Sequence, residues 1–138
     1  MNSALFSSKN DDWSTPQEFF DILNEEFLFT LDACALSENA KCKLFFTPAD
    51  DGLVQDWSGH TVFVNPPYGR KIAEWVKKCY YESCKENTKV VMLIPARTDT
   101  VYFHKYIYGK AEIRFIKGRL KFGNALHGAP FPSMIVVY

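Results

Sequence analysis

The sequence lacks any apolar run long enough to cross a membrane. Its longest uncharged apolar run, Val90 to Ala96, is far shorter than the roughly 20 residues that a spanning helix needs. The first residues, MNSALFSSKNDD, contain no apolar core of signal-peptide length. We therefore exclude a transmembrane protein and expect a cytoplasmic one with no membrane partner.

Cysteine and histidine are scarce and are not spaced as metal ligands. Cys34, Cys42, Cys79 and Cys84 form no C-x-x-C pair, and none of the three histidines lies at a matching spacing. We therefore expect no metal site, and reduced, mostly buried thiols.

Net charge is also absent, but the balance is uneven along the chain. Residues 1–65 carry a net charge of −8 and residues 66–138 carry +8. Unless folding mixes these charges, the second half predicts a surface that faces a polyanion.

The length and composition fit one globular domain. The chain has 138 residues, of which 47% are hydrophobic and 23% charged, the balance of a folded protein rather than a disordered one. We expect residues 1–10 to form a flexible arm and residues 11–138 to form a single domain.

Strand-like and helix-like segments alternate along the chain. Thr15 and Pro16, followed by Glu18, form a helix start with core residues at Phe19 and Leu23. Further helices are predicted over 71–86 and 100–108, and strands over 27–35, 61–65, 89–95, 111–116, 119–122 and 133–138. This alternation predicts an α/β fold built as a three-layer sandwich.

Three groups of residues lie at the ends of predicted strands, where ligands bind in such sheets. They lie in residues 32–35, 65–69 and 95–97. The second group is the most specific, because Pro66 and Pro67 fix two φ angles and remove two backbone N–H donors. The Asn65 side-chain oxygen and the Pro66 carbonyl then offer acceptors beside the Tyr68 ring, which suits a planar heterocycle bearing an amino group. A turn with a surface tyrosine is the alternative interpretation.

The segment from Asn65 to Gly69, NPPYG, resembles the motif of amino-group methyltransferases that use S-adenosylmethionine. The closer resemblance is to the small phage-type DNA N-6-adenine methyltransferases. Further blocks resemble that family in the same order: DDWSTPQEFF, LDACA with ENAKC, DDGLVQDW, LIPARTDT, GRLKFG and APFPS. The resemblance covers nearly the whole chain from Asp11. It implies a minimal Rossmann-like methyltransferase fold and a phage or prophage enzyme that methylates adenine in a bacterial host cell.

The resemblance also implies where the cofactor binds. It places the amino-acid end of S-adenosylmethionine near Thr15-Pro16 and near Asp32, with Cys34 and Ala35 following. It further implies that Asp56 accepts from the cofactor's adenine amino group and that Trp57 lies against its ring. The loop LDACALSENA lacks the glycines that larger adenine methyltransferases usually have there. The acid that binds the ribose stays open between Glu38, Asp50 and Asp51.

The resemblance assigns the target adenine to Asn65, Pro66, Pro67 and Tyr68. The sulfonium of S-adenosylmethionine is already an excellent leaving group, so the protein mainly aligns the methyl carbon with the N6 lone pair. Acceptors that hold the amino hydrogens stabilise the charge that the nitrogen gains. The adenine has to leave the duplex to be reached, and Tyr68 replaces part of the lost stacking.

The basic side chains of the second half are candidates for nucleic-acid contacts. Arg97 follows a strand end and is assigned to a substrate phosphate, with a salt bridge or helix cap as the alternative. Lys117, Arg119 and Lys121 alternate, so they share one face in an extended segment and are assigned to duplex phosphates. With no room for a separate recognition domain, specificity is modest or depends on a homodimer. RNA adenine, a protein glutamine and a non-catalytic DNA-binding module stay open as alternatives.

Overall fold

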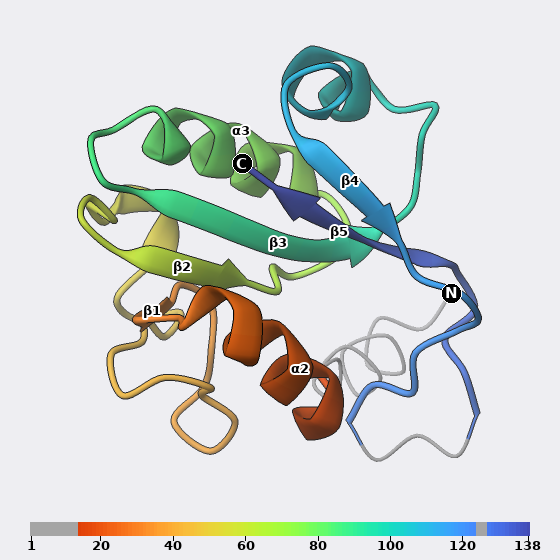
Figure 1. Ribbon diagram of the computed structural model, residues 1–138, viewed down its shortest axis with the longest axis horizontal. Coiled ribbons are helices and arrows are strands. Elements are labelled where there is room, and N and C mark those ends of the chain that lie inside the picture. The colour runs from red at the N-terminus through yellow and green to blue at the C-terminus, as the bar shows by residue number, and fades with distance from the viewer. Residues whose placement is uncertain (1–13, 124–126) are drawn as a thin grey trace.

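The computed structural model describes residues 14–123 and 127–138, and the predicted arm over 1–10 lies outside them. The chain forms a small α/β domain around one five-stranded sheet with the order β1-β2-β3-β5-β4 (Figure 1). The strands are β1 (Leu31–Asp32), β2 (Thr61–Val64), β3 (Lys89–Pro95), β4 (Glu112–Phe115) and β5 (Ser133–Val137).

The sheet is mixed. β1, β2 and β3 are parallel, whereas β5 runs antiparallel to both of its neighbours, β3 and β4. The carboxyl ends of β1, β2, β3 and β4 therefore lie at one edge, together with the beginning of β5. We call this the carboxyl edge.

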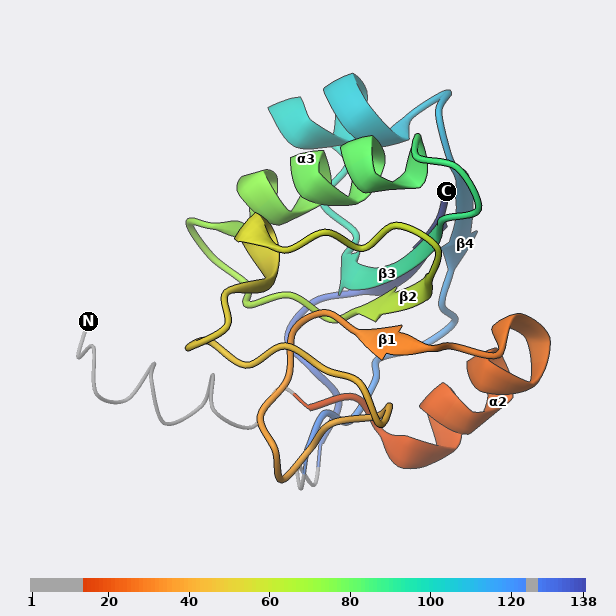
Figure 2. The same cartoon turned by 90° about the vertical axis from the view of Figure 1, so that its left-hand side faces the viewer.

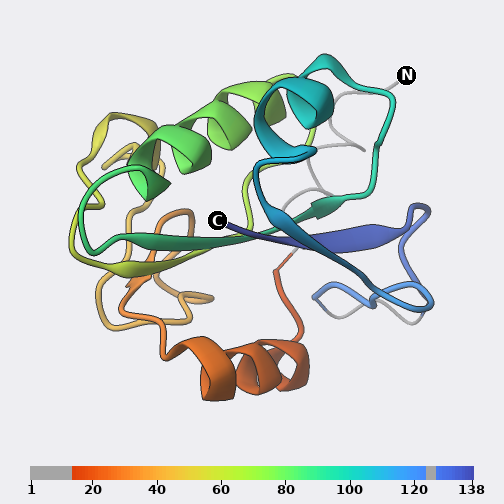
Figure 3. The same ribbon diagram turned by 45° about the horizontal axis from the view of Figure 1, so that its top comes forward.

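Helices cover the two faces of the sheet (Figures 2 and 3). β3 shows why, because it is apolar on both sides: Val90, Met92 and Ile94 belong to one core, and Val91 and Leu93 to the other. The first core includes side chains of α3 (Ile72–Ser83) and of the π-helical turn η2 (Phe103–Ile107). The second includes side chains of α2 (Gln17–Phe27).

The predicted strand over 27–35 is wrong in its length. α2 continues through Phe27, and Leu28 ends it in the left-handed conformation with φ 55°, its amide donating to Asn24 O. The chain then turns, so only Leu31 and Asp32 pair with β2. Thr15 is also not the cap of α2, because Pro16 is the residue before the first helical turn and no side chain caps the helix.

The predicted strand over 119–122 is also absent among the described residues. Residues 117–131, which we call the basic loop, instead leave β4 and return to β5; residues 124–126 are not described. The two sides of the basic loop approach closely, since Ala129 N donates to Leu120 O. A Cβ added at Gly128 would lie 2.5 Å from Cβ of Arg119, so this approach requires glycine.

No helix in residues 14–123 and 127–138 has the length and apolar character to cross a membrane.

Candidate active site

A cavity of about 250 Å³ opens at the carboxyl edge, and we call it the first cavity. It is lined by eight of the predicted site residues: Thr15, Asp32, Cys34, Ala35, Asn65, Pro66, Pro67 and Tyr68. They come together because β1 and β2 are parallel neighbours, so Asp32 and Asn65 sit at adjacent strand ends. Residues of two of the three predicted groups, 32–35 and 65–69, thus meet at this cavity, whereas residues 95–97 do not line it.

Asp32 is the buried acid of the first cavity, with 2% of its surface exposed. Its Oδ2 accepts from the amide of Lys41 at 3.0 Å and its Oδ1 from the amide of Cys34 at 3.3 Å. Burial raises the pKa of Asp32 to about 6, although these two amides and the charge of Lys41 act in the opposite direction. The carboxylate is thus held in place at the cost of desolvation, a cost that a cationic ligand group would offset.

Asn65 is oriented by two hydroxyl groups. Its Nδ2 donates to Oγ1 of the buried Thr15 at 3.0 Å, and its Oδ1 accepts from the Tyr68 hydroxyl at 2.9 Å. This chain fixes the amide, so its oxygen has a defined direction at the wall of the first cavity. Thr15 therefore acts on Asn65 rather than on the helix that follows it.

The Tyr68 ring is supported by the basic loop. Phe122 and Phe131 meet it at nearly right angles, with centroids 6.1 and 5.6 Å away. Gly123 N also donates to the backbone oxygen of Ser14, which lines the first cavity. The basic loop and the first cavity are thus in direct contact.

Sequence reasoning missed the contribution of the irregular segment 36–60. Asn39 and Lys41 line the first cavity, and Lys41 Nζ donates to Gln17 Oε1 at 2.8 Å. Burial lowers the pKa of Lys41, partly offset by Asp32 and Asp21. The block ENAKC contained both residues, but no spacing in the sequence distinguished them from solvated side chains.

A second cavity of about 200 Å³ adjoins the first and shares Cys34, Pro48 and Pro67 with it. Its wall includes Asp51 and Leu53, together with Phe46, Gly52 and Trp75. Thr47 and Lys71 also line it, so the second cavity has largely apolar walls with one acid and one lysine.

The structure distinguishes the three acids considered for ribose binding by whether they line a cavity. Asp51 lines the second cavity, and its Oδ1 accepts from the amide of Leu53 at 3.1 Å. Asp50 instead closes a local turn by accepting from Thr47, and Glu38 accepts from Ser37. Asp51 is thus the candidate that reaches a cavity.

Asp56 and Trp57 are not brought to either cavity. They precede β2 and so lie at the opposite end of that strand from Asn65. Asp56 is exposed and pairs with Lys85 at 2.9 Å, which lowers its pKa together with bonds from Ser58. Trp57 is completely buried, so its ring cannot lie against a bound cofactor. The structure therefore places neither residue where the resemblance implies a cofactor contact; of the same block, Asp51 and Leu53 line the second cavity instead.

The predicted phosphate contacts are all exposed at the carboxyl edge. Arg97 follows β3, and Lys117 follows β4. Arg119 and Lys121 continue the basic loop, and Leu120 and Phe122 between and after them are more buried. The predicted alternation is therefore present from Arg119 to Phe122 without a strand, whereas Gly118 is exposed like Lys117 and has φ 78°. Pro16 and these four basic residues do not line the cavities.

Comparison with known families decides the kind of protein. A family model described as DNA N-6-adenine-methyltransferase (Dam) matches residues 2–135. The chain belongs to this family. The resemblance seen in the sequence motifs and the prediction of an adenine-specific DNA methyltransferase are thereby confirmed.

Two relatives of this Dam family member come from phages. The DNA N-6-adenine-methyltransferase of Haemophilus phage HP1 is 32% identical over 139 residues, which is 95% of this chain and 80% of the phage protein. The protein of the same name from Escherichia phage T1 is 35% identical over 112 residues, 80% of this chain and 46% of its own length.

The donor that a methyltransferase family implies is S-adenosylmethionine, and the Dam family site fits it. The donor has a cationic amino-acid end and a nucleoside end. The first cavity offers the buried Asp32, and the adjoining second cavity offers apolar walls with Asp51. In the described part of the chain, no three His, Cys, Asp or Glu side chains are placed to hold a metal ion. Burial raises the pKa of Cys34 to about 12, so this thiol at the cavity wall stays protonated.

Proposed function

We propose that residues 11–138 form a catalytic domain that binds S-adenosylmethionine across the two cavities and methylates N6 of a flipped-out adenine in double-stranded DNA. The observation that carries this proposal is the meeting of Asp32 and the oriented Asn65 in one cavity. The three parallel strands, with helices on both faces, support a shortened Rossmann-like methyltransferase fold with three layers. The phage relatives support a phage or prophage enzyme that acts in the cytoplasm of a bacterial host.

The amino-acid end of the cofactor is assigned to the first cavity. Asp32 binds the ammonium group there, because this ionic contact offsets the desolvation of its carboxylate. Lys41 lies at the same wall and is suited to the carboxylate of the ligand. Thr15, with Pro16 behind it, and the backbone at Cys34 and Ala35 complete this half of the site.

The nucleoside end is assigned to the second cavity. Apolar surface for a planar base is provided by Phe46, Leu53 and Trp75. Asp51 accepts hydrogen bonds from the hydroxyl groups of the ribose or from an amino group of the ligand. The two cavities share Cys34 and Pro67, so one extended molecule passes from one to the other.

The target adenine is assigned to the turn at Asn65. When bound, the cofactor supplies a methyl group on a sulfonium leaving group. Asn65 Oδ1 and the Pro66 carbonyl accept from the amino group of adenine, which favours a pyramidal nitrogen and stabilises the positive charge that it gains. Pro67 keeps the turn rigid, and Tyr68 both orients Asn65 and forms part of the wall beside the base.

The decisive test is nucleoside analysis after incubation with labelled S-adenosylmethionine, run on double-stranded DNA, RNA and protein with chelator present. We expect labelled N6-methyladenine in DNA. Label only in RNA or in protein glutamine contradicts the substrate, and loss of activity with chelator contradicts a metal-free reaction. No transfer to any substrate, with DNA still bound, would indicate a non-catalytic DNA-binding module.

The DNA surface is assigned to Arg97 and to Lys117, Arg119 and Lys121 of the basic loop. All are exposed at the edge where the first cavity opens. Each phosphate contact releases condensed counterions, so DNA affinity falls as salt increases. A homodimer would present two such surfaces to one DNA site, and sedimentation with and without DNA tests that arrangement.

A salt series tests the DNA surface. The triple variant Lys117→Ala, Arg119→Ala, Lys121→Ala should reduce the slope of log affinity against log salt by about 0.9 per lost contact. The control removes equal charge from exposed lysines on α3, in η2 and after η2: Lys77→Ala, Lys105→Ala, Lys110→Ala. Equal slopes in the two triple variants would mean that the basic loop does not contact phosphate.

A further inference from the structure

The wall of the second cavity is built on an unusually close backbone approach at Gly52. A Cβ added there would lie 2.2 Å from the carbonyl oxygen of Ala33 and 2.9 Å from the Trp75 ring. Gly52 also begins the short 3₁₀ helix η1 (Gly52–Val54), whose N-cap, Asp51, has φ 56°. The directions of Asp51 and Leu53 therefore depend on how Gly52 is held.

Trp57 holds Gly52 from behind the cavity wall. Its Nε1–H donates to the Gly52 carbonyl at 3.0 Å, and its ring stacks on Trp75 with centroids 6.3 Å apart. Both Gly52 and Trp57 are buried, so this bond has no water to replace it. The indole thus connects the wall to α3, which carries Trp75.

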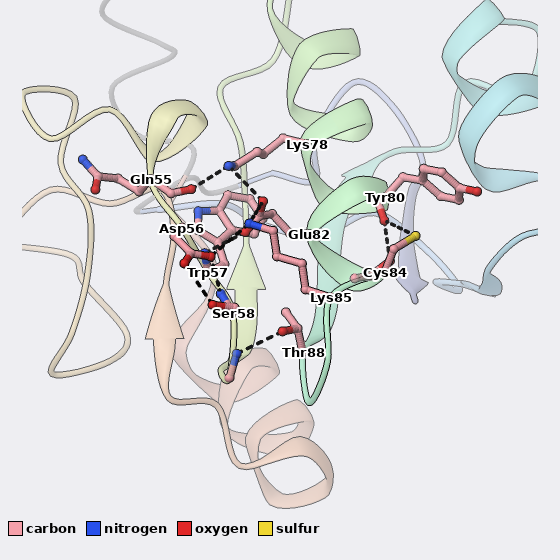
Figure 4. Close-up of polar contacts among 12 residues, drawn as sticks. Gln55, Asp56, Trp57, Ser58, Lys78, Tyr80, Glu82, Cys84, Lys85 and Thr88 are labelled. Carbon is pink, nitrogen blue, oxygen red and sulfur yellow. Dashed lines mark hydrogen bonds and ion pairs between the residues drawn. The ribbon is translucent and has the colours of Figure 1, made fainter.

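Glu82 of α3 holds Trp57 in turn (Figure 4). Its Oε1 accepts from the Trp57 amide at 2.7 Å, and its Oε2 is bound by Lys78 at 3.1 Å and Lys85 at 2.7 Å. Lys78 also donates to the Gln55 carbonyl. The carboxylate is 4% exposed and binds both the segment before β2 and its own helix.

We propose that Trp57 and Glu82 are positioning residues for the nucleoside half of the cofactor site. They act through Gly52, which sets where Asp51 and Leu53 meet a bound nucleoside. This inference rests on the proposed assignment of the second cavity to the nucleoside. It gives the DDGLVQDW block one role: Asp51 and Leu53 touch the ligand, and Trp57 fixes their backbone from the core.

The test compares three ligands on conservative variants. Trp57→Phe keeps a buried ring but removes the Nε1–H donor, and Glu82→Gln keeps an acceptor but removes the charge that binds Lys78 and Lys85. Calorimetry gives affinities for S-adenosylhomocysteine, for 5′-methylthioadenosine as the nucleoside half, and for duplex DNA. We expect both nucleoside ligands to bind roughly tenfold more weakly to Trp57→Phe, and a smaller loss in Glu82→Gln. DNA affinity, and kcat at saturating cofactor, should stay within about twofold because Asn65 is untouched.

Two further variants separate the outcomes. Asp56→Asn weakens the exposed pair with Lys85, which keeps its contact with Glu82, and retains an oxygen acceptor for Ser58, so this variant should bind all three ligands normally. If it weakens cofactor binding as much as Trp57→Phe does, the segment touches the cofactor directly and the positioning role is wrong. If Asp51→Asn weakens nucleoside binding while Trp57→Phe and Glu82→Gln do not, the positioning role fails and the cofactor site stands. If Asp51→Asn has no effect either, the assignment of the second cavity fails as well.

A purely structural role would give a different pattern. Trp57→Phe and Glu82→Gln would then lower the urea midpoint and weaken cofactor and DNA binding to similar extents. That result overturns the proposal. Should Trp57→Phe fail to fold, Glu82→Gln supplies the same comparison.

Discussion

Asp32 and Glu82 are both buried acids, yet their surroundings have opposite effects. Among the described residues Asp32 accepts from backbone amides, and burial raises its pKa to about 6. Burial acts on Glu82 too, but hydrogen bonds from Lys85, from the Trp57 amide and from Lys78 outweigh it and lower the pKa. Asp32 thus faces a cavity with capacity for a cation, whereas Glu82 is already saturated by two.

The difference extends to the two edges of the sheet. At the carboxyl edge, polar groups such as Asp32 and Asn65 border a cavity, and their hydrogen bonds fix their direction there. At the opposite edge, around Trp57 and Glu82, the polar groups bind one another and support packing. Substitutions at the first edge should therefore change ligand binding and turnover more than stability. Substitutions at the second edge should lower stability, and those at Trp57 and Glu82 should also weaken nucleoside binding, as proposed above.

Glu82→Ala should have the largest effect on stability. It leaves Lys78, Lys85 and the Trp57 amide without their shared acceptor, and breaking a buried ionic cluster costs about 3 kcal/mol of unfolding free energy. Urea denaturation measures this loss. The control is Glu74→Ala, an exposed residue on the same helix, which should stay within about 0.5 kcal/mol of the parent. Equal losses would remove the distinction between the two acids.

Asn65→Ala should lower kcat by roughly a hundredfold, because it removes a preorganised acceptor at the reacting nitrogen. Affinity for S-adenosylhomocysteine and the urea midpoint should change little. Asn65→Asp keeps an oxygen acceptor beside Thr15 and Tyr68 and should lose less activity. Steady-state kinetics on duplex DNA decides, and an equal loss in both variants would argue against an acceptor role.

Asp32→Asn should weaken S-adenosylhomocysteine binding roughly tenfold to a hundredfold, the cost of losing a charged hydrogen bond. In the parent, affinity should increase as pH rises through about 6, where Asp32 ionises, and then level off. The variant should lack this rise. Calorimetry between pH 5 and 8 measures both profiles, and a rise retained in Asp32→Asn would assign it to another group.

Stability should respond to Asp32 in the opposite sense. Its pKa is higher in the folded state, about 6, than the ordinary pKa of an aspartate, about 3.8, so the folded protein binds more protons between these values. Asp32 therefore lowers stability as pH rises from about 4 to 6. Asp32→Asn should remove this decline and leave the unfolding free energy at pH 7 undiminished. Urea titrations of the parent and the variant at about pH 4 and at pH 7 measure both effects.

Tyr68→Phe should have the smallest effect, about a tenfold decrease in kcat or less. The ring keeps its packing on Phe122 and Phe131, but the hydroxyl that orients Asn65 is lost. The exposed Tyr81 of α3 offers a control, and Tyr81→Phe should leave kcat unchanged. If Tyr68→Phe also leaves kcat unchanged, the Tyr68 hydroxyl is not needed to orient the Asn65 amide.

The parts of the site that sequence reasoning found are those that strand ends determine. Asp32 and Asn65 follow apolar residues that form parallel strands, so their meeting follows from chain topology alone. Lys41 and Asp51 were not distinguished, because they come from irregular segments whose path depends on tertiary contacts. Trp57 was misassigned for a different reason: the sequence pattern of an acid followed by an aromatic residue is the same whether the aromatic ring faces a ligand or packs in the core.

The errors in the fold have local causes. The apolar run over 27–35 carries no signal for the left-handed Leu28 that divides it between a helix end and a short strand. Exposure alternates only from Arg119 to Phe122, because Gly118 is exposed like Lys117 and has φ 78°, and the basic loop has little strand pairing.

The position of β5 has a consequence for how the protein is made. β5 comes last among the strands in chain order, but it lies between β3 and β4, and β4 pairs with β5 in the described sheet. During synthesis from the N-terminus, β4 and the basic loop emerge before the strand that joins them to the rest of the sheet. The nascent chain thus carries Asp32 and Asn65 early, but β4 and the basic loop join the sheet in a late, long-range step of folding.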